Sequence, residues 1–375
     1  MSTAGIIFAN LHDNNIPELT RWRTMCSVPF ACRYRLIDFS LSNMINSGIT
    51  NVHIITNQNY QSLSDHIGSG KDWDLARRSG GIKILAPYMT AFANNGLSPR
   101  SSRLEALKSI NGTIYDMNCD NIVLCDGDGI CNVDIAAMVA QHEKTNADIT
   151  FAVKSIALSE ELAAKSIVYT SDDNGVITDV LVRPKEATGI QDVGINIMVV
   201  TKRYLQIILH DAIARGYTSL SLDIIAKNAG KYMIFRHDDF YASPTSMESY
   251  YMTNMQLLES SEARNSLFNV KNRSVYTKIR NSAPTNYVTG SKVVNSLIAD
   301  GCVIEGTVEN SIIFRGVKVG KGAVVKNSIL FQDTYVCPNA SLDSVITDKN
   351  VVIRDGRKLV GYKTMPFYIE KGKML

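Results

Sequence analysis

The stretch Arg33–Gly48 reads RYRLIDFSLSNMINSG and lies between two short β-rich runs, Gly5–Ala9 and Val52–Thr56. Within it, residues Arg35–Ser47 read as a helix. A strand, a helix and a second strand in this order predict a β-α-β unit with parallel strands. The first part of the chain is therefore expected to be an α/β domain built on a mainly parallel sheet.

The same alternation of strands and helices continues to about residue 250. A second helix is expected over Asp134–Lys144. Further strands are expected at Ile122–Cys125, Ile149–Val153, Val176–Val182, Ile195–Val200 and Met233–Arg236. Ligands of such sheets bind beyond the carboxyl ends of the strands. The stretches Asn10–Ile16 and Asp126–Asp128 fall at those ends, so they are candidates for a binding site.

A different pattern begins near Thr285. Four triplets recur at intervals of 15, 17 and 16 residues: Asn295-Ser296-Leu297, Asn310-Ser311-Ile312, Asn327-Ser328-Ile329 and Asp343-Ser344-Val345. Short strands with Gly, Asn and Asp at their corners predict a left-handed β-helix of hexapeptide repeats, with about three hexads per coil. The alternative is chance alternation in a β-sandwich. We thus expect an α/β domain over residues 1–250, a connector over 251–284 and a β-helix over 285–375, whose flat faces suit oligomerisation.

The composition excludes several classes of protein. The chain has 375 residues, of which 39 are basic and 36 acidic, so its formal net charge of +3 argues against nucleic acid as a partner. Its seven cysteines form no C-x-x-C pair and show no metal-ligand spacing, which favours reduced thiols in the cytoplasm. The N-terminal AGIIFAN reads as a strand rather than a signal peptide. No apolar run approaches the roughly 20 residues of a membrane span.

The motif RYRLIDFSLSN resembles the signature of the bacterial ADP-glucose pyrophosphorylases (glucose-1-phosphate adenylyltransferases), sugar nucleotidyltransferases that make the glucosyl donor for glycogen. The resemblance runs without gaps from about Gly5 to Leu75, and it is clear again at Asp128 and across Val294–Gly306. It implies a Rossmann-like nucleotidyltransferase domain, with a mainly parallel sheet, followed by a C-terminal left-handed β-helix.

The nucleotide loop of the resembling family, Gly-Gly-x-Gly-Thr-Arg-Leu, is replaced in this chain. Asn10, Leu11 and Asp13 stand at its three glycine positions, and Asn15 stands at its arginine position. Glycines let the backbone approach a triphosphate and point N–H groups at it. The Asp13 carboxylate would repel a phosphate charge about 4 Å away by about 4 kcal/mol at an effective dielectric constant of about 20. The alternative, a misplaced alignment, is disfavoured because the first half has no other glycine-rich strand-to-helix turn with a basic residue nearby.

The resemblance also implies a Mg²⁺ site held by two aspartates from separate strands. Asp128 matches the first aspartate, whereas Ser243 stands at the second, so we expect no required cofactor and only weak Mg²⁺ binding. Asp126 could partly replace the lost ligand. Alternatively, Asp126 and Asp128 form the polar end of a buried strand. The sugar-phosphate motif Glu-Lys-Pro becomes VRP with Arg183, and Met25 replaces a lysine that follows the nucleotide loop.

Three arginines are candidates for an effector site. In the resembling family, arginines that match Arg23 and Arg35 contribute to a site for phosphorylated metabolites between the catalytic domain and the β-helix, and Arg33 lies beside them in the sequence. Guanidinium groups suit phosphate recognition. The alternative is a solvated helix edge with local salt bridges. The family's lysine before Arg23 is Trp22 here, and a nearby histidine is Pro29, so we expect an altered pocket.

These replacements together imply the regulatory, GlgD-type subunit of the family rather than the catalytic one. Such a subunit pairs with a catalytic subunit, as a heterotetramer, and tunes that partner's response to activators. One rival reading is an active sugar-phosphate nucleotidyltransferase with a divergent loop. Another is an acyltransferase built on the β-helix, but such enzymes usually carry a catalytic histidine there, and no histidine follows His237.

Overall fold

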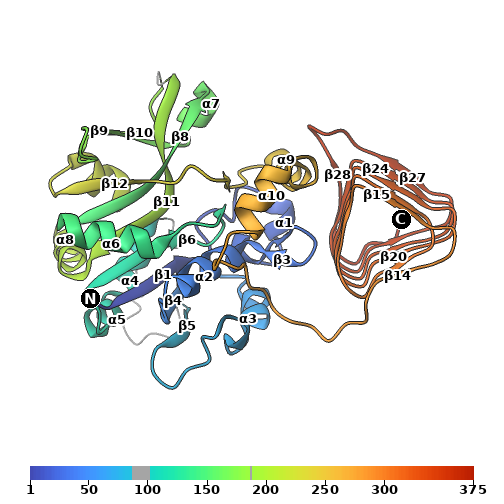
Figure 1. The fold of residues 1–375 in the computed structure, drawn as a ribbon, viewed down its shortest axis with the longest axis horizontal. Coiled ribbons are helices and arrows are strands. Elements are labelled where there is room, and N and C mark those ends of the chain that lie inside the picture. The colour runs from blue at the N-terminus through green and yellow to red at the C-terminus, as the bar shows by residue number, and fades with distance from the viewer. Residues whose placement is uncertain (87–101, 186–187) are drawn as a thin grey trace. The chain divides into compact units, whose positions relative to one another are not determined.

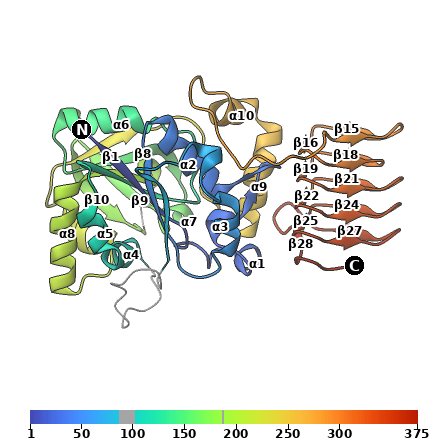
Figure 2. The same ribbon diagram turned by 90° about the horizontal axis from the view of Figure 1, so that it is seen from below.

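The computed structural model describes residues 1–86, 102–185 and 188–375 and is drawn as a ribbon in Figures 1 and 2. The chain divides into two compact units, each built from segments that are far apart in the sequence. Unit 1 comprises Met1–Leu11, Phe39–Tyr241 and Val270–Tyr276. Unit 2 comprises His12–Asp38, Ala242–Asn269 and Thr277–Leu375.

Unit 1 is built on one large mixed sheet. Within the described residues this sheet has nine strands, in the order β10-β9-β11-β6-β1-β4-β5, with β8 between β11 and β12. Their bounds are β1 (Thr3–Phe8), β4 (Asn51–Ile55), β5 (Gly81–Leu85), β6 (Asn121–Asp126), β8 (Ile149–Leu158), β9 (Ile167–Ser171), β10 (Ile177–Val182), β11 (Gly189–Thr201) and β12 (Tyr232–Arg236). Strands β6, β1, β4 and β5 are parallel, whereas β11 runs antiparallel to β6, β8 and β9.

Helices cover both faces of this sheet. On one face, α4 (Arg103–Ser109), α5 (Asn111–Asp116) and α8 (Lys202–Arg215) bury their apolar side chains against alternate residues of β1 and β6. On the other face, Met44 of α2 (Leu36–Asn46) packs against Gly5, where a Cβ would lie 2.9 Å from its sulfur. His142 of α6 (Ile135–Thr145) reaches Thr150 of β8 at 2.9 Å on the same side. The helices and strands expected from the sequence are therefore confirmed.

Shorter elements complete unit 1. They are α3 (Gln61–Ile67), β7 (Ile130–Cys131), α7 (Glu160–Ala163), a π-helical turn (Leu220–Ile224) and single 3₁₀ turns (Lys71–Trp73, Ile225–Lys227). Strand β13 (Tyr241–Ala242) lies at the sequence boundary between the units. None of the helices in the described residues is long and apolar enough to cross a membrane. All seven cysteines are described, and they are free thiols.

The C-terminal part of unit 2 is the expected left-handed β-helix. Figure 1 shows its triangular cross-section, and Figure 2 shows its coils stacked in parallel. Among the described residues, each of its three sides is a parallel sheet of five short strands. The first side has β14 (Asn286–Tyr287), β17 (Val303–Ile304), β20 (Lys318–Val319), β23 (Tyr335–Val336) and β26 (Val352–Ile353). The second has β15 (Lys292–Val294), β18 (Thr307–Glu309), β21 (Val324–Lys326), β24 (Ser341–Asp343) and β27 (Lys358–Val360). The third has β16 (Leu297–Ile298), β19 (Ile312–Ile313), β22 (Ile329–Leu330), β25 (Val345–Thr347) and β28 (Phe367–Ile369).

The repeated Asn-Ser triplets form one corner of this β-helix. Asn310 and Asn327 have positive φ values of 46° and 45°, which asparagine tolerates better than most residues. The backbone N–H of Ser328 donates to Oγ of Ser311 at 3.1 Å, so the buried serines form a ladder between coils. In the last triplet the register shifts by one residue. There Ser344 takes the positive φ of 55°, and the N–H of Val345 donates to Oγ of Ser328 at 3.1 Å.

Unit 2 contains further elements besides the β-helix. They are α1 (Pro17–Thr20), a 3₁₀ turn (Met25–Ser27), the hairpin of β2 (Pro29–Phe30) and β3 (Tyr34–Arg35), α9 (Met247–Glu259) and α10 (Ser261–Phe268). Helix α9 connects them. The Tyr251 hydroxyl donates to the carbonyl of Asn327 at 2.6 Å, and Oδ1 of Asn254 accepts from the N–H of Ala31 at 3.1 Å. The segment that carries the arginines 23, 33 and 35 is thereby fixed within the same unit as the β-helix.

Candidate functional site

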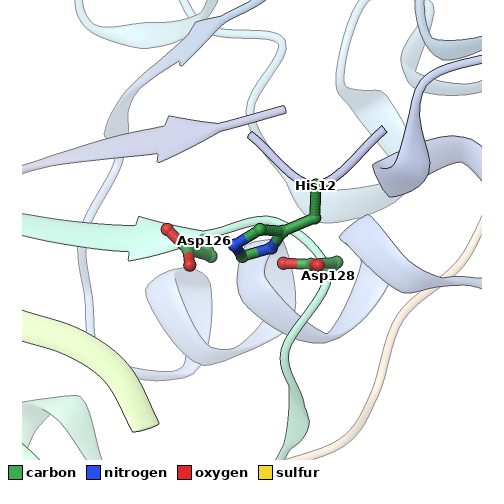
Figure 3. Close-up of side chains that lie close together, drawn as sticks. All are labelled: His12, Asp126 and Asp128. Atoms are coloured by element: carbon green, nitrogen blue, oxygen red, sulfur yellow. The ribbon is translucent and has the colours of Figure 1, made fainter. Parts of the chain in front are cut away.

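Three strand ends meet at the carboxyl edge of the unit 1 sheet. In the parallel register, Phe8 of β1 is paired with both Ile55 of β4 and Asp126 of β6. The loops that follow these strands therefore leave the sheet together, as expected. Figure 3 shows Asp126 at the end of β6 and Asp128 in the segment that follows; His12, also labelled there, is the first residue of unit 2.

Asn10 and Leu11, which stand at two glycine positions of the nucleotide loop, are engaged inside unit 1. Oδ1 of Asn10 accepts hydrogen bonds from Oγ1 of Thr56 at 2.8 Å and from the N–H of Asn57 at 2.7 Å. Its Nδ2 donates to the carbonyl of Gln58 at 3.1 Å. Leu11 packs against the apolar core. Both side chains thus occupy the end of β1 and fix the loop after it to the loop after β4.

Asp13 and Met25 are engaged inside unit 2. Oδ1 of Asp13 accepts a hydrogen bond from the N–H of Met25 at 2.7 Å, and its carbonyl accepts from Oγ1 of Thr20 at 2.6 Å. Met25 is buried in a 3₁₀ turn, whereas Asn15 is exposed and its N–H closes a turn on the carbonyl of His12 at 3.0 Å. The Asp13 carboxylate, which stands at a glycine position of the family loop, therefore stabilises the conformation of its own segment.

Asp126 is paired with an arginine that the sequence reading did not select. Nε of Arg103 donates to Oδ1 of Asp126 at 2.8 Å, and Nη2 donates to Oδ2, so the contact is bidentate. The Asp126 side chain is 2% exposed and that of Arg103 is 18% exposed. Asp128 is also buried, and one of its carboxylate oxygens lies within 4.8 Å of one from Asp126. The end of β6 therefore holds two carboxylates and one guanidinium.

The neighbouring hollow of unit 1 is narrowed by an aromatic ring. It is lined by Arg103, Tyr169, Gly194 and Asn196, among other residues. Tyr169 stacks on Phe151 with 4.8 Å between ring centroids, and a Cβ on Gly194 would lie only 2.8 Å from the ring of Tyr169. The Tyr169 ring therefore packs directly on the backbone of Gly194, where any larger residue would clash with it.

Two predicted site residues lie outside these contacts. Arg183 is exposed at the end of β10, with a positive φ of 53°, and its N–H donates to the carbonyl of Ser166 at 2.8 Å. Ser243 belongs to unit 2, where it is half-buried three residues before Ser246, the N-cap of α9. Neither residue is part of the Arg103–Asp126 pair.

A second buried arginine–aspartate pair lies in unit 2. Nη2 of Arg23 lies 2.7 Å from Oδ1 and 3.0 Å from Oδ2 of Asp348, and these two side chains are only 3% and 0% exposed. Oδ1 of Asp348 also accepts the N–H of Lys349 at 2.7 Å, and Oδ2 accepts the hydroxyl of Tyr368 at 3.0 Å. The pair joins the N-terminal segment of unit 2 to the last coils of the β-helix.

The surroundings of this second pair are strongly positive. The pKa of Lys349 is lowered to about 7, chiefly by burial and also by Arg35, Arg23 and Arg280, against the opposing effect of Asp348. Arg35 is buried, whereas Arg33 is exposed and its guanidinium lies 5.8 Å from the centroid of the Tyr34 ring. Three arginines and one carboxylate thus act on Lys349. We call Arg23, Arg35, Arg280 and Lys349 the cationic group of unit 2.

The sequence reading missed Arg103, Asp348 and Lys349. The sequence did contain one signal for Arg103. Ser102 is suited to cap a helix, and the first turn of a helix favours acidic residues, so an arginine directly after this serine is unusual. Asp348 and Lys349 break the apolar–small alternation at a corner of the β-helix, but only the coil geometry places them beside Arg23. Sequence spacing alone could not pair residues so far apart.

Comparisons with known proteins agree with this architecture. A family model described as "Nucleotidyl transferase" matches residues 15–231, and one described as "GlmU-like, C-terminal hexapeptide" matches residues 283–365. The chain is 30% identical over 333 residues to a glucose-1-phosphate adenylyltransferase of Clostridium botulinum, covering 86% of this chain and 83% of the relative. The chain belongs to the glucose-1-phosphate adenylyltransferase family of nucleotidyl transferases.

Other members of the family match over almost the whole chain. The "Glycogen biosynthesis protein GlgD" of Bacillus subtilis is 27% identical over 376 aligned residues, covering 98% of this chain and 95% of the relative. A glucose-1-phosphate adenylyltransferase of Bacillus cereus is 27% identical over 355 residues, covering 94% and 93%. The present chain thus has the frame of the family, but the side chains at the position of the nucleotide loop make hydrogen bonds within the protein.

Proposed function

We propose that this chain is a regulatory, largely non-catalytic subunit of glucose-1-phosphate adenylyltransferase, the enzyme that makes ADP-glucose and pyrophosphate from ATP and glucose 1-phosphate in glycogen biosynthesis. It binds a catalytic subunit of the same family in a heterotetramer and tunes that subunit's affinity for activators and substrates. The similarity to a protein named for glycogen biosynthesis and to adenylyltransferases supports the pathway.

The use of the loop side chains for internal contacts supports the loss of catalysis. A triphosphate needs backbone N–H groups at close range and a cation to offset the charge that develops during transfer. Here Asn10 closes the loop on Asn57, and Asp13 holds Met25. Catalysis would require these hydrogen bonds to break before the phosphates could approach.

The cationic group of unit 2 supports a regulatory role. Arg35, Arg280 and Lys349 all act on the same small region, and Nη1 of Arg23 is buried with no hydrogen-bond partner among the described residues. A multivalent anion, such as a phosphorylated metabolite, would relieve the repulsion among these groups. Arg23 is fixed by Asp348, so Arg35 and Lys349 supply most of the binding charge, with Arg33 as an exposed addition.

Regulation of the partner follows from linkage. An effector bound to this chain changes the activity of the catalytic subunit only if the active state of the complex binds the effector better than the inactive state does. A tenfold preference corresponds to about 1.4 kcal/mol. The β-helix and the segment with the arginines belong to one compact unit, so an anion there acts on that unit.

The decisive experiment compares the chain alone with the chain mixed with its catalytic partner. Alone, it is expected to make negligible ADP-glucose from ATP, glucose 1-phosphate and Mg²⁺. Mixed, it is expected to co-elute with the partner and to lower the activator concentration needed for half-maximal turnover. Substantial turnover by the chain alone, abolished by Asp128→Asn, would establish the rival reading of an active nucleotidyltransferase.

Two arginine variants separate effector binding from assembly. Arg35→Met is expected to raise the half-maximal activator concentration of the complex about tenfold or more, because a buried charge that faces the anion is lost. Arg215→Met, at the exposed end of α8, is the matched control and should change neither assembly nor activation. An activator response that is the same in both variants would contradict the proposed effector site.

A further inference from the structure

The end of β6 is where membership of the adenylyltransferase family implies a divalent cation. Mg²⁺ prefers near-octahedral oxygen coordination and is usually held by one or two carboxylates together with water. Here both oxygens of Asp126 accept hydrogen bonds from the Arg103 guanidinium, whose charge would repel a metal ion. The Asp128 carboxylate, which is also buried, is not part of this bidentate contact. This donor set does not fit Mg²⁺.

The position of Arg103 is explained by this contact rather than by local preference. Arg103 is the first residue of α4, where negative rather than positive side chains are favoured by the helix dipole. The Ser102 side chain caps the helix on the N–H of Glu105 at 3.2 Å, and Leu104 and Leu107 are buried in the core. The helix start is therefore fixed, and the arginine on it is directed to Asp126.

The guanidinium is permanently charged in this place. Burial by itself lowers the pKa of Arg103, but the Asp126 carboxylate more than reverses this, and Asp128 adds to the effect, so that the pKa is raised above its usual value. An arginine also presents several N–H donors in a planar fork that matches a carboxylate. The guanidinium therefore offsets the charge of Asp126 and part of that of Asp128.

We propose that Arg103 is a built-in cation that replaces the divalent metal at the end of β6, so that this pocket is assembled without any metal ion. Asp128 matches a metal-binding aspartate of the family and Asp126 lies close to it, and the Arg103 guanidinium from α4 occupies the place beside them that a cation would take. A corollary is that the two aspartates form a latent metal site, which the loss of Arg103 would open.

Mn²⁺ binding to the full chain, followed by electron paramagnetic resonance, tests this proposal. The wild-type chain is expected to show no saturable site at this pocket, and its melting temperature should not respond to Mg²⁺ or Mn²⁺. Arg103→Met should gain one site and bind Mn²⁺ at least about tenfold more tightly, because the repelling charge is gone while both carboxylates stay. Arg103→Lys keeps the charge and should not gain the site.

Two further variants define the site that is gained. Adding Asp126→Asn or Asp128→Asn to Arg103→Met should abolish the new Mn²⁺ site. Arg315→Met is the matched control elsewhere in the chain, because Arg315 is also buried and its Nε lies 3.0 Å from Oδ1 of a single carboxylate, Asp300. That variant should gain no site, since it leaves a single carboxylate where the end of β6 holds two.

The outcomes decide the proposal without reference to the partner subunit. A wild-type chain that binds Mn²⁺ as tightly as Arg103→Met, or a folded Arg103→Met chain that gains nothing, would overturn it. If Arg103→Met does not fold, wild-type Mn²⁺ binding that Asp128→Asn removes would overturn it equally. The proposed regulatory function fails by a different readout, namely ADP-glucose synthesis by the chain alone, so the two failures can be told apart.

Discussion

The two units of this protein each contain a buried arginine–aspartate pair, and the charges around the two pairs are opposite. In unit 1, Arg103–Asp126 has a second acid, Asp128, as its neighbour. In unit 2, Arg23–Asp348 is surrounded by further cations, Arg35, Arg280 and Lys349. Each unit therefore contains the same type of ion pair, but the neighbouring charge is negative in unit 1 and positive in unit 2.

This difference indicates what each region would accept. In unit 1, two carboxylates stand against one guanidinium, and Arg103 occupies the place beside Asp126 that a cation would take. In unit 2, Arg35, Arg23 and Arg280 all act on Lys349, so the region favours an anion. The proposed loss of catalysis concerns the first region, and the proposed regulatory role concerns the second.

The largest effect is expected when the carboxylate of unit 2 is removed. Asp348→Ala removes the carboxylate that Nη2 of Arg23 contacts, and it leaves Arg23 buried near the positive charge of Lys349. Breaking a buried ion pair in this way should lower the free energy of unfolding by about 3–5 kcal/mol. Urea denaturation followed by circular dichroism checks this, with Asp348→Asn as a milder control. A loss below about 1 kcal/mol would mean that this pair behaves like an ion pair on the surface.

A smaller loss is expected from the equivalent change in unit 1. Asp126→Ala removes the bidentate partner of Arg103, but Asp128 stays close enough to offset part of the charge. The free energy of unfolding should fall by about 1–3 kcal/mol, in the range for a buried group that keeps partial compensation. The same denaturation assay measures both variants. If Asp126→Ala proves more destabilising than Asp348→Ala, the contrast between the two surroundings is wrong.

The unbalanced charge of unit 2 should appear as pH-dependent anion binding. The pKa of Lys349 is lowered to about 7 by burial and by Arg35, Arg23 and Arg280, with Asp348 opposing. A bound sulfate favours the charged amine and raises that pKa, so affinity is full below about pH 7 and falls as the pH rises through it. A rise of one pKa unit on binding corresponds to an about tenfold loss of affinity. Calorimetry with sulfate between pH 6 and pH 9 tests the profile, on either side of the value near 7. Lys349→Met should flatten it.

The smallest effect is expected on the exposed face of the β-helix. Glu309 of β18 lies between Lys292 and Lys326, with Nζ–Oε distances of 3.0 and 3.1 Å, in a ladder of charges that faces solvent. Exposed ion pairs are screened by water and salt. Glu309→Gln should therefore change neither the denaturation midpoint nor the sulfate affinity measurably. A clear loss of sulfate affinity would show that long-range charge, rather than the cationic group of unit 2, controls anion binding.

Much of the fold could be predicted from the sequence because its signals are local and repeated. The strand Gly5–Ala9 and the helix Arg35–Ser47 follow from short-range patterns, and both are present as β1 and α2. The Asn-Ser triplets predicted the coils because each one fits the same corner of positive φ and buried serine ladder. The fourth triplet shows the limit of this reading. In that triplet the positive φ falls on Ser344 rather than on Asp343, and the sequence of the triplet did not predict this shift.

The replaced nucleotide loop was visible in the sequence, but the contacts that its new residues make were not. The letters at positions 10, 11 and 13 excluded a glycine cradle without showing what the side chains would do instead. The structure shows that Asn10 bonds to the loop after β4 and that Asp13 holds Met25. These hydrogen-bond partners are many residues apart in the chain, so the spacing of residues in the sequence could not predict the contacts.

The sequence by itself determined the class of fold and the repeats of the β-helix, and it predicted the replacement of the nucleotide loop, because these depend on residues close together in the chain. Only the tertiary structure decided the charge balance. Arg103 meets Asp126 across 23 residues, and Arg23 meets Asp348 across 325 residues. The strength and sign of a buried charge depend on every group folded around it, and that set is defined only once the sheet and the coils have closed.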